Sequence, residues 1–293
     1  MPFPPSSILP MKSWTLALAL LIPVVPLAAQ TAVTAPGLLV NPGPGSISDP
    51  AAIETWHRTD VRAGSSIGID GTFTYGAPGA VYLSGTNGTS KADLTYLFAA
   101  NNYQLLSTFS TGQYSWLKSS ASGPDVAPAP SMRLMIYDPV LAAAGFLIYE
   151  PYINGPNAAP EDIWTTSAFS ATSGSLWLRL QGASCYNNDI GNLPTIQGYA
   201  GGASVSCDNA TSKSLSASTF VYGFNFGIGS GWNDSFLGAV DGVQFAFSTG
   251  LNRSFDFQLV GGDQDVVPEP ATMTLLATGL AGIAASRRRK RGR

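Results

Sequence analysis

Short runs of alternating apolar and polar residues fill the middle of the chain, and Gly, Asn, Ser and Pro separate them. The alternation is close to period two in 133–137 and 254–259, the spacing typical of a strand with one buried face. No stretch of the body keeps a helical period for more than about three turns. The pattern therefore predicts strands that include 67–75, 93–98, 103–109, 132–137, 146–149, 175–180, 219–226, 243–247 and 254–260.

Many short strands separated by turns are typical of an antiparallel β-sandwich or barrel. We predict an all-β fold with one β-sandwich domain over residues 51–262 and roughly ten to thirteen strands. Residues 30–50 are rich in Pro and Gly and are expected to form a linker. The 32 glycines and 21 prolines of the 293 residues also disfavour a helical bundle.

The N-terminal segment has the pattern of a secretory signal peptide. An apolar, Leu- and Ala-rich run from Trp14 to Ala29 follows Lys12 and ends in small residues that suit a signal peptidase. Pro23 and Pro26 argue against an ordinary buried helix, because each removes a helical donor. We therefore predict a signal peptide over residues 1–29 and export of the chain.

The C-terminal segment combines a short apolar run with a basic end. The apolar run of 271–286 is expected to cross the membrane, although about 15 residues of helix reach only about 22 Å. The expected membrane-stop residues follow it: Arg287, Arg288, Arg289, Lys290 and Arg291, within a basic tail over 287–293. By the positive-inside rule, the tail stays in the cytoplasm and the preceding chain lies outside.

The net charge of −3 hides a strong asymmetry along the chain. Between Thr31 and Pro270 there are eight basic and 18 acidic residues, a net charge of −10. Nucleic acid is therefore not an expected partner, because its binding needs a basic surface.

The C-terminal segment closely resembles the PEP-CTERM sorting signal: a Pro-Glu-Pro triplet, a short apolar helix and an arginine-rich end. Here the motif residues are Val267, Pro268, Glu269 and Pro270, within a segment over 263–293. The resemblance implies a Gram-negative bacterium, transient anchoring in the inner membrane, and processing near the triplet by a membrane protease, the exosortase. It also implies a final location at the cell surface or outside the cell.

A second resemblance concerns residues 227–232 and 235–243, which look like the end of concanavalin-A-like jelly rolls. In those folds the block forms the last strands, its aspartate, here Asp241, sits at a turn, and the final strand pairs near the first.

The two cysteines, Cys185 and Cys207, are expected to pair, since an exported protein meets an oxidising compartment. No metal site or cofactor is predicted with them. A structural calcium ion is the one alternative left open, with oxygen ligands in two groups: Asn187, Asn188, Asp189 and Asp208, or Asp263 and Asp265.

Catalytic chemistry has little support in the sequence, and we predict that the protein is not an enzyme. His57 is the only histidine, and no Gly-x-Ser-x-Gly elbow accompanies it. A glycoside hydrolase would need two carboxylates across one cleft, for which Glu150 and Glu161 are the candidates.

The leading hypothesis is therefore a structural or adhesive protein of the cell surface or extracellular matrix. The alternative is a carbohydrate-binding module for exopolysaccharide, which predicts a row of exposed aromatic residues on one sheet face. Trp116, Trp164 and Tyr152 are the candidates for stacking on sugar rings.

Overall fold

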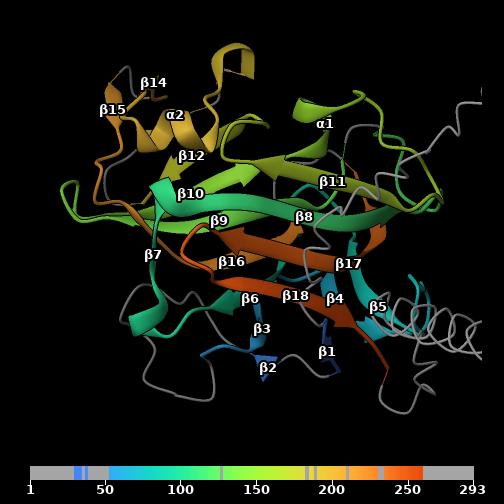
Figure 1. Cartoon of the computed structure of the whole chain (residues 1–293). Helices are drawn as coiled ribbons and strands as arrows, with labels where there is room; N and C mark the ends of the chain where they lie inside the picture. The colour runs from blue at the N-terminus through green and yellow to red at the C-terminus, as the bar shows by residue number, and fades with distance from the viewer. Residues whose placement is uncertain are drawn as a thin grey trace, which may run out of the picture.

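The computed structural model describes residues 30–34, 37–38, 53–125, 128–181, 185–187, 190–208, 211–229 and 234–259. Two large sheets dominate these residues (Figure 1), and almost all of their strand pairs are antiparallel. This confirms the predicted all-β sandwich. The predicted signal peptide, the apolar segment 271–286, the sorting motif and the basic tail all lie outside the described residues.

The seven-stranded sheet is organised around one long strand, β17. This strand pairs with β8 along one side, and with β5 and then β18 along the other. The outer strands β11, β4 and β1 complete the sheet. Its strands are β1 (Thr31–Val33), β4 (Ser65–Asp70), β5 (Ala80–Gly85), β8 (Phe109–Lys118), β11 (Thr165–Ser170), β17 (Phe236–Phe247) and β18 (Asn252–Phe257).

The nine-stranded sheet has the order β13-β12-β10-β9-β16-β6-β3-β2, with β7 also paired to β16. Its strands are β2 (Gly37–Leu38), β3 (Trp56–Thr59), β6 (Ala92–Leu97), β7 (Gln104–Leu105), β9 (Ser131–Asp138), β10 (Ala143–Tyr149), β12 (Leu176–Leu180), β13 (Cys185–Tyr186) and β16 (Phe220–Ile228).

The remaining described elements are small. A hairpin of β14 (Ser204–Ser206) and β15 (Ser212–Ser214) lies beside α2 (Ile196–Ala200) at the upper left of Figure 1, and α1 (Pro151–Asn154) lies at the upper right. Three short 3-10 helices cover Ala100–Asn102, Leu106–Thr108 and Ile190–Asn192. The second of these interrupts the strand predicted over 103–109.

Aromatic side chains fill the space between the two sheets. At the centre, Phe224 of β16 stacks on Phe245 of β17, with ring centroids 3.9 Å apart and planes 9° apart. Towards one edge, Trp56 contacts Phe226 from its own sheet and Phe255 from the other. Because each buried aromatic ring removes a large apolar area from water, these contacts are a main source of stability.

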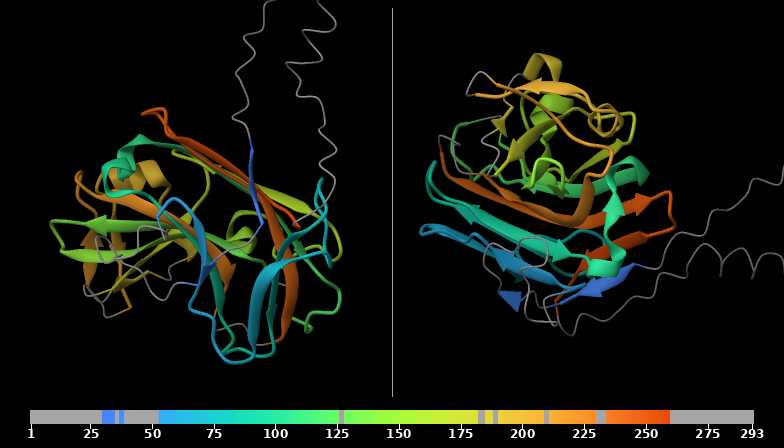
Figure 2. Two further views of the ribbon diagram at one scale, coloured as in Figure 1. Left: turned by 90° about the horizontal axis from the view of Figure 1, so that it is seen from below. Right: turned by 90° about the vertical axis from the view of Figure 1, so that its left-hand side faces the viewer.

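Two short strands form inside the segment that was expected to be only a linker. Residues 31–33 pair in parallel with β18, which Figure 2 shows as a blue strand beside a red-orange one, and residues 37–38 pair in parallel with β3. The sheets therefore extend beyond the domain boundary expected at residue 51. The pairing of β1 with β18 also agrees with the expectation that the final strand lies near the first.

Asp241 occupies the point where β17 changes its neighbour from β5, paired up to Val240, to β18, paired from Val243. It lies within the strand rather than at a turn, contrary to the expectation. Its Oδ1 accepts hydrogen bonds from the backbone N–H groups of Gly242 at 2.6 Å and Phe257 at 3.0 Å. Where a neighbouring strand ends, backbone N–H groups lose their partners in the sheet. The Asp241 carboxyl group takes the place of the missing backbone acceptors.

The cysteine pair closes a segment at the edge of the nine-stranded sheet. Cys185 of β13 and Cys207, just after β14, form a disulfide across a sequence separation of 22 residues. The loop that it closes contains α2 and β14. Both cysteines are buried, so the bond anchors this segment to the main core.

The buried carboxyl group of Asp241 predicts a stability that falls as the pH rises. Burial, together with the nearby Asp256 carboxylate, raises its pKa to about 8, although the hydrogen bonds from Phe257 and Gly242 act in the opposite direction. Between about pH 4 and pH 8 the folded state therefore holds a proton that the unfolded state has lost, and the free energy of unfolding decreases. Urea unfolding at pH 5 and pH 8.5 should show that Asp241→Asn reduces this decrease by about 2–4 kcal/mol.

The Asn variant keeps an oxygen acceptor for the two amides but cannot ionise. Asp256→Asn is the matched control: it removes a neighbouring charge that raises the pKa of Asp241, so the loss of stability should end at a lower pH and be smaller. Equal pH dependence of the wild-type protein and Asp241→Asn would contradict the assignment.

Removing the disulfide should destabilise the protein and expose the closed segment. The double variant Cys185→Ser/Cys207→Ser should lose about 3 kcal/mol of unfolding free energy, since a loop of this length becomes unconstrained in the unfolded chain. Limited proteolysis should then cut first between residues 186 and 206. Unchanged stability together with an unchanged cleavage pattern would refute this role.

Candidate functional site

The nine-stranded sheet carries a second set of large side chains on the side that faces away from the core, here called the outer face. Successive side chains of a strand point to opposite faces, so Phe224 and Phe226 in the core place Asn225 on the outer face. The same alternation assigns the following to it: Arg133, Met135 and Tyr137 of β9, Phe146 and Ile148 of β10, and Trp177 and Arg179 of β12.

Part of the outer face is a small hydrophobic cluster separate from the main core. Leu97, Met135 and Tyr222 are buried at its base. Partly exposed side chains pack over them: Tyr103, Tyr137, Phe146 and Phe220. Tyr103 stacks on Phe220 with ring centroids 5.2 Å apart.

The partly exposed aromatic residues form a row across five adjacent strands, here called the aromatic row: Phe220, Tyr137, Phe146, Trp177 and Tyr186. Phe220 is paired with Tyr137 across β16 and β9, and Trp177 contacts Tyr186 at 4.9 Å across β12 and β13. At a strand spacing of about 4.8 Å, the row spans roughly 19 Å. It is long enough to contact several units of a polymer.

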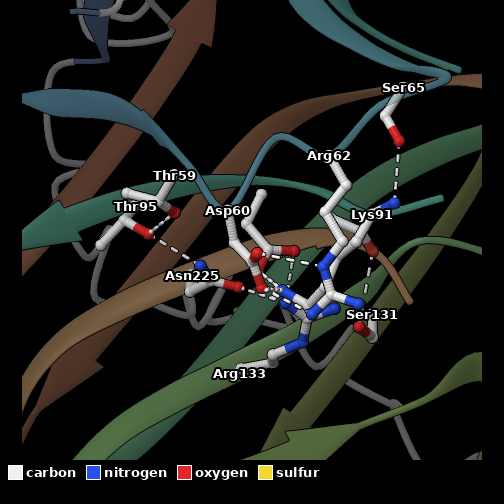
Figure 3. A network of polar contacts seen from close by, with 11 residues as sticks. Thr59, Asp60, Arg62, Ser65, Lys91, Thr95, Ser131, Arg133 and Asn225 are labelled. Carbon is white, nitrogen blue, oxygen red and sulfur yellow. Dashed lines mark hydrogen bonds and ion pairs between the residues drawn. The ribbon is translucent and has the colours of Figure 1, made fainter. Parts of the chain in front are cut away.

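A chain of polar contacts also lies on the outer face, and Figure 3 shows it from close by. Arg133 Nη1 donates to Asp93 Oδ1 at 2.5 Å and to Asn225 Oδ1 at 2.7 Å. The Asn225 amide in turn donates to Thr95 Oγ1 at 2.7 Å, which bonds to Thr59 Oγ1 at 2.8 Å. The chain thus links β9, β16, β6 and β3, four successive strands of the sheet.

Each charged side chain in this network has a partner of opposite charge. Lys91 bridges the carboxylates of Asp93 and Asp60, and Asp60 also pairs with Arg62. Asp93 is 4% exposed and Arg133 is 6% exposed, and burying either charge alone would cost several kcal/mol. The paired network therefore fixes the side chains beneath the row and leaves little freedom to rearrange.

Glu150 lies directly after β10, at the start of α1. Burial raises the pKa of its carboxyl group, and hydrogen bonds with Tyr152 and Trp177, together with the Arg133 charge, oppose that effect only in part. Glu150 thus lies close to Trp177 of the aromatic row and to Tyr152 of α1.

Two of the three predicted stacking residues line one cavity of about 290 Å³ between α1 and β11. Tyr152 lies in its wall together with Tyr149 and Trp116. Trp116 is only 2% exposed, and its Nε1 donates to Ser167 Oγ at 2.9 Å. Its ring therefore belongs to the core and does not present a face at the surface.

Trp164, the third predicted residue, lies apart from the outer face. Its ring packs against Tyr75 with centroids 4.9 Å apart, and it is half-buried just before β11 of the seven-stranded sheet. No described contact connects it with the aromatic row. The structure thus groups Trp116 with Tyr152 and separates both from Trp164.

The carboxylates considered for hydrolysis bind different partners. Glu150 bonds to Tyr152 and Trp177 on the outer face, whereas Glu161 is exposed and pairs with Lys118 of β8 at 3.4 Å. Glu54 pairs with Arg253 at 3.0 Å; burial raises its pKa, but bonds from Asn102, Arg253 and Tyr96 outweigh this and lower it to about 2. Each carboxylate thus has a structural partner of its own.

The described part of the chain contains no group of three or more His, Cys, Asp or Glu side chains that could hold a metal ion. Of the possible calcium ligands, Asn187 is buried, and Asn188, Asp189, Asp263 and Asp265 lie outside the described residues. No helix within the described ranges is long and apolar enough to cross a membrane. His57 lies in β3, at the position opposite Thr95.

Sequence reasoning missed the aromatic row. A usable signal was present, because Trp177 and Arg179 alternate with the buried Leu176, Leu178 and Leu180. Such alternation marks Trp177 as facing away from the core, whereas Trp116 lies in a run of five consecutive buried residues, 114–118. Because both faces of β8 are buried at this point, the sequence shows no alternation there that would indicate which way Trp116 points.

Three solved structures resemble this fold at a distance. A family 11 carbohydrate-binding module from Clostridium thermocellum, in complex with a β-1,3-1,4-mixed-linked tetrasaccharide, is 10% identical with a TM-score of 0.38; the match covers 66% of this chain and 89% of that chain. The same family's module from the cellulase Lic26A-Cel5E of that organism gives 12% identity, a TM-score of 0.37 and coverages of 66% and 87%. The cellulose-induced protein Cip1 is 12% identical with a TM-score of 0.34, and the match covers 67% of this chain and 92% of that chain.

No curated protein sequence matches the chain. A family model does match its C-terminal segment, over residues 266–290, and that model describes the PEP-CTERM protein-sorting motif. The match includes all four predicted motif residues and the expected apolar and basic segments up to Lys290. The chain therefore carries the PEP-CTERM sorting motif of an exported protein.

Proposed function

We propose that this exported protein binds polysaccharide through the outer face and has no catalytic activity. The observation that supports the proposal is the aromatic row, whose rings are partly exposed on five adjacent strands. Sugar rings present apolar C–H faces and polar edges, so they suit a surface that offers both aromatic rings and hydrogen-bonding groups. Holding a polymer in this way would give the protein an adhesive or structural role in the extracellular matrix.

The buried polar network supports such a role because it makes the surface rigid. Arg133 and Asn225 each form two side-chain hydrogen bonds in this network. A binding surface that is already ordered loses less side-chain entropy when a ligand binds. More of the free energy of each contact between a ring and a sugar therefore remains available for binding.

The route to the matrix follows from the two ends of the chain. A signal peptidase would remove residues 1–29, and residues 271–286 would hold the protein in the inner membrane of a Gram-negative cell, with the basic tail in the cytoplasm. The exosortase would then process the chain near Pro268, Glu269 and Pro270. The mature protein would carry eight basic and 17 acidic residues, a net charge of −9.

Replacing rings of the aromatic row should weaken polysaccharide binding. Trp177→Ala and Phe146→Ala should each reduce the affinity for exopolysaccharide from the producing cells by about tenfold, equivalent to about 1.4 kcal/mol. Affinity electrophoresis with the purified mature protein measures this change.

The matched controls are partly exposed aromatic residues outside the outer face. Trp164→Ala and Phe73→Ala remove rings that pack on Tyr75 and Tyr82, and they should leave binding unchanged. Loss of affinity in the controls alone, or no binding by the wild-type protein, would contradict the proposal.

Sorting should shorten the chain at its C-terminus. The intact mass of the protein released by its own cells should lack the apolar segment and the basic tail. Substituting Pro268, Glu269 and Pro270 together by alanine should retain those segments and keep the protein in the membrane fraction. A released protein that still extends to Arg293 would refute the processing step.

A further inference from the structure

Most basic side chains of the body are already neutralised by carboxylates. Of the eight basic residues between Thr31 and Pro270, five form ion pairs within the described residues: Arg62, Lys91, Lys118, Arg133 and Arg253. Of the other three, Arg58 and Lys213 are half-buried, and Arg179 is exposed. Arg179 is thus the exposed cation of the described body that has no carboxylate partner.

Arg179 lies inside the aromatic row. In the strand register it stands directly between Phe146 of β10 and Tyr186 of β13. Burial and the Glu150 charge raise the pKa of the Tyr186 hydroxyl, while the charge of Arg179 opposes them, so the guanidinium lies close to that ring. Trp177, two residues earlier on the same strand, also contacts Tyr186.

Arg133, the other arginine of the outer face, has different surroundings from Arg179. Arg133 is bound to Asp93 and Asn225 and is almost completely buried, so its charge is paired inside the protein and does not reach a ligand at the surface. Arg179 instead presents its guanidinium to solvent between two aromatic side chains. This planar group has a fixed set of donors that matches the two oxygens of a carboxylate.

We propose that Arg179 makes the outer face selective for polysaccharides that contain carboxylated sugars. The guanidinium forms a paired hydrogen bond with the carboxylate of one sugar unit, and Phe146 and Tyr186 contact the flanking rings of the polymer. The mature body carries a net charge of −9, which repels an acidic polymer at long range. The exposed cation in the row is therefore the feature that allows an acidic polymer to bind at this position. This inference rests on the proposed function.

The test compares acidic polymers with their neutral counterparts. Polygalacturonate, polymannuronate and hyaluronan are each prepared in the native form and with the carboxyl groups reduced to alcohols, and binding to the purified mature protein is measured at constant ionic strength. We expect at least one native polymer to bind, at least tenfold more tightly than its reduced form. Arg179→Gln should abolish that preference, so that the native and reduced forms bind with similar affinity.

Two further variants separate charge from geometry. Lys213→Gln changes the net charge by the same amount on the β14–β15 hairpin and should keep the preference. Arg179→Lys keeps the charge but lacks the planar group, and it should retain only part of the preference.

Equal loss in Arg179→Gln and Lys213→Gln would overturn the inference, because net charge would then explain the effect. Binding of the native, carboxylated polymers that depends on Trp177 but not on Arg179 would also overturn it, while the proposed function would stand. If the wild-type protein bound neither form of any polymer nor exopolysaccharide from its own cells, both proposals would fail.

Discussion

The stacking of Phe224 on Phe245 joins the centres of the two sheets, and much of the structure follows from it. Phe224 lies in β16, and the strict alternation of a β-strand then directs Asn225 to the opposite side. The neighbouring strands pair in register with β16 and with one another. Arg133 and Trp177 therefore also point away from the core. The aromatic interior thus determines which side chains the outer face displays.

The outer face is unusual because the polar network of Arg133, Asp93 and Asn225 is buried while several aromatic rings of the same face are partly exposed. Water normally surrounds charged side chains, and a buried pair such as Arg133 and Asp93 persists only when its hydrogen bonds are complete. The network meets that condition through Asn225 and Lys91. A rigid base of this kind is what the proposed binding of a polysaccharide to the outer face requires.

The sequence was sufficient to predict the all-β sandwich, the disulfide and the sorting motif, because each depends on a local pattern. It was not sufficient to place individual tryptophans. Trp116 is buried because its side chain faces the core between the two sheets, and that core forms only when β8 pairs with β17 and β11, which lie more than 40 residues away. Asp241 was expected at a turn, and its position at the branch of β17 depends on three strands at once. Such long-range pairings leave no local signal.

Direct observation of the tryptophan side chains during binding tests the central claim, that polysaccharide binds to the outer face. The indole N–H groups of Trp177 and Trp116 give separate NMR signals, which can be assigned with the single substitutions Trp177→Phe and Trp116→Phe. On titration with exopolysaccharide, the Trp177 signal should shift progressively, while the signal of the buried Trp116 stays in place. A shift confined to Trp116 or Trp164, with Trp177 unchanged, would contradict the account.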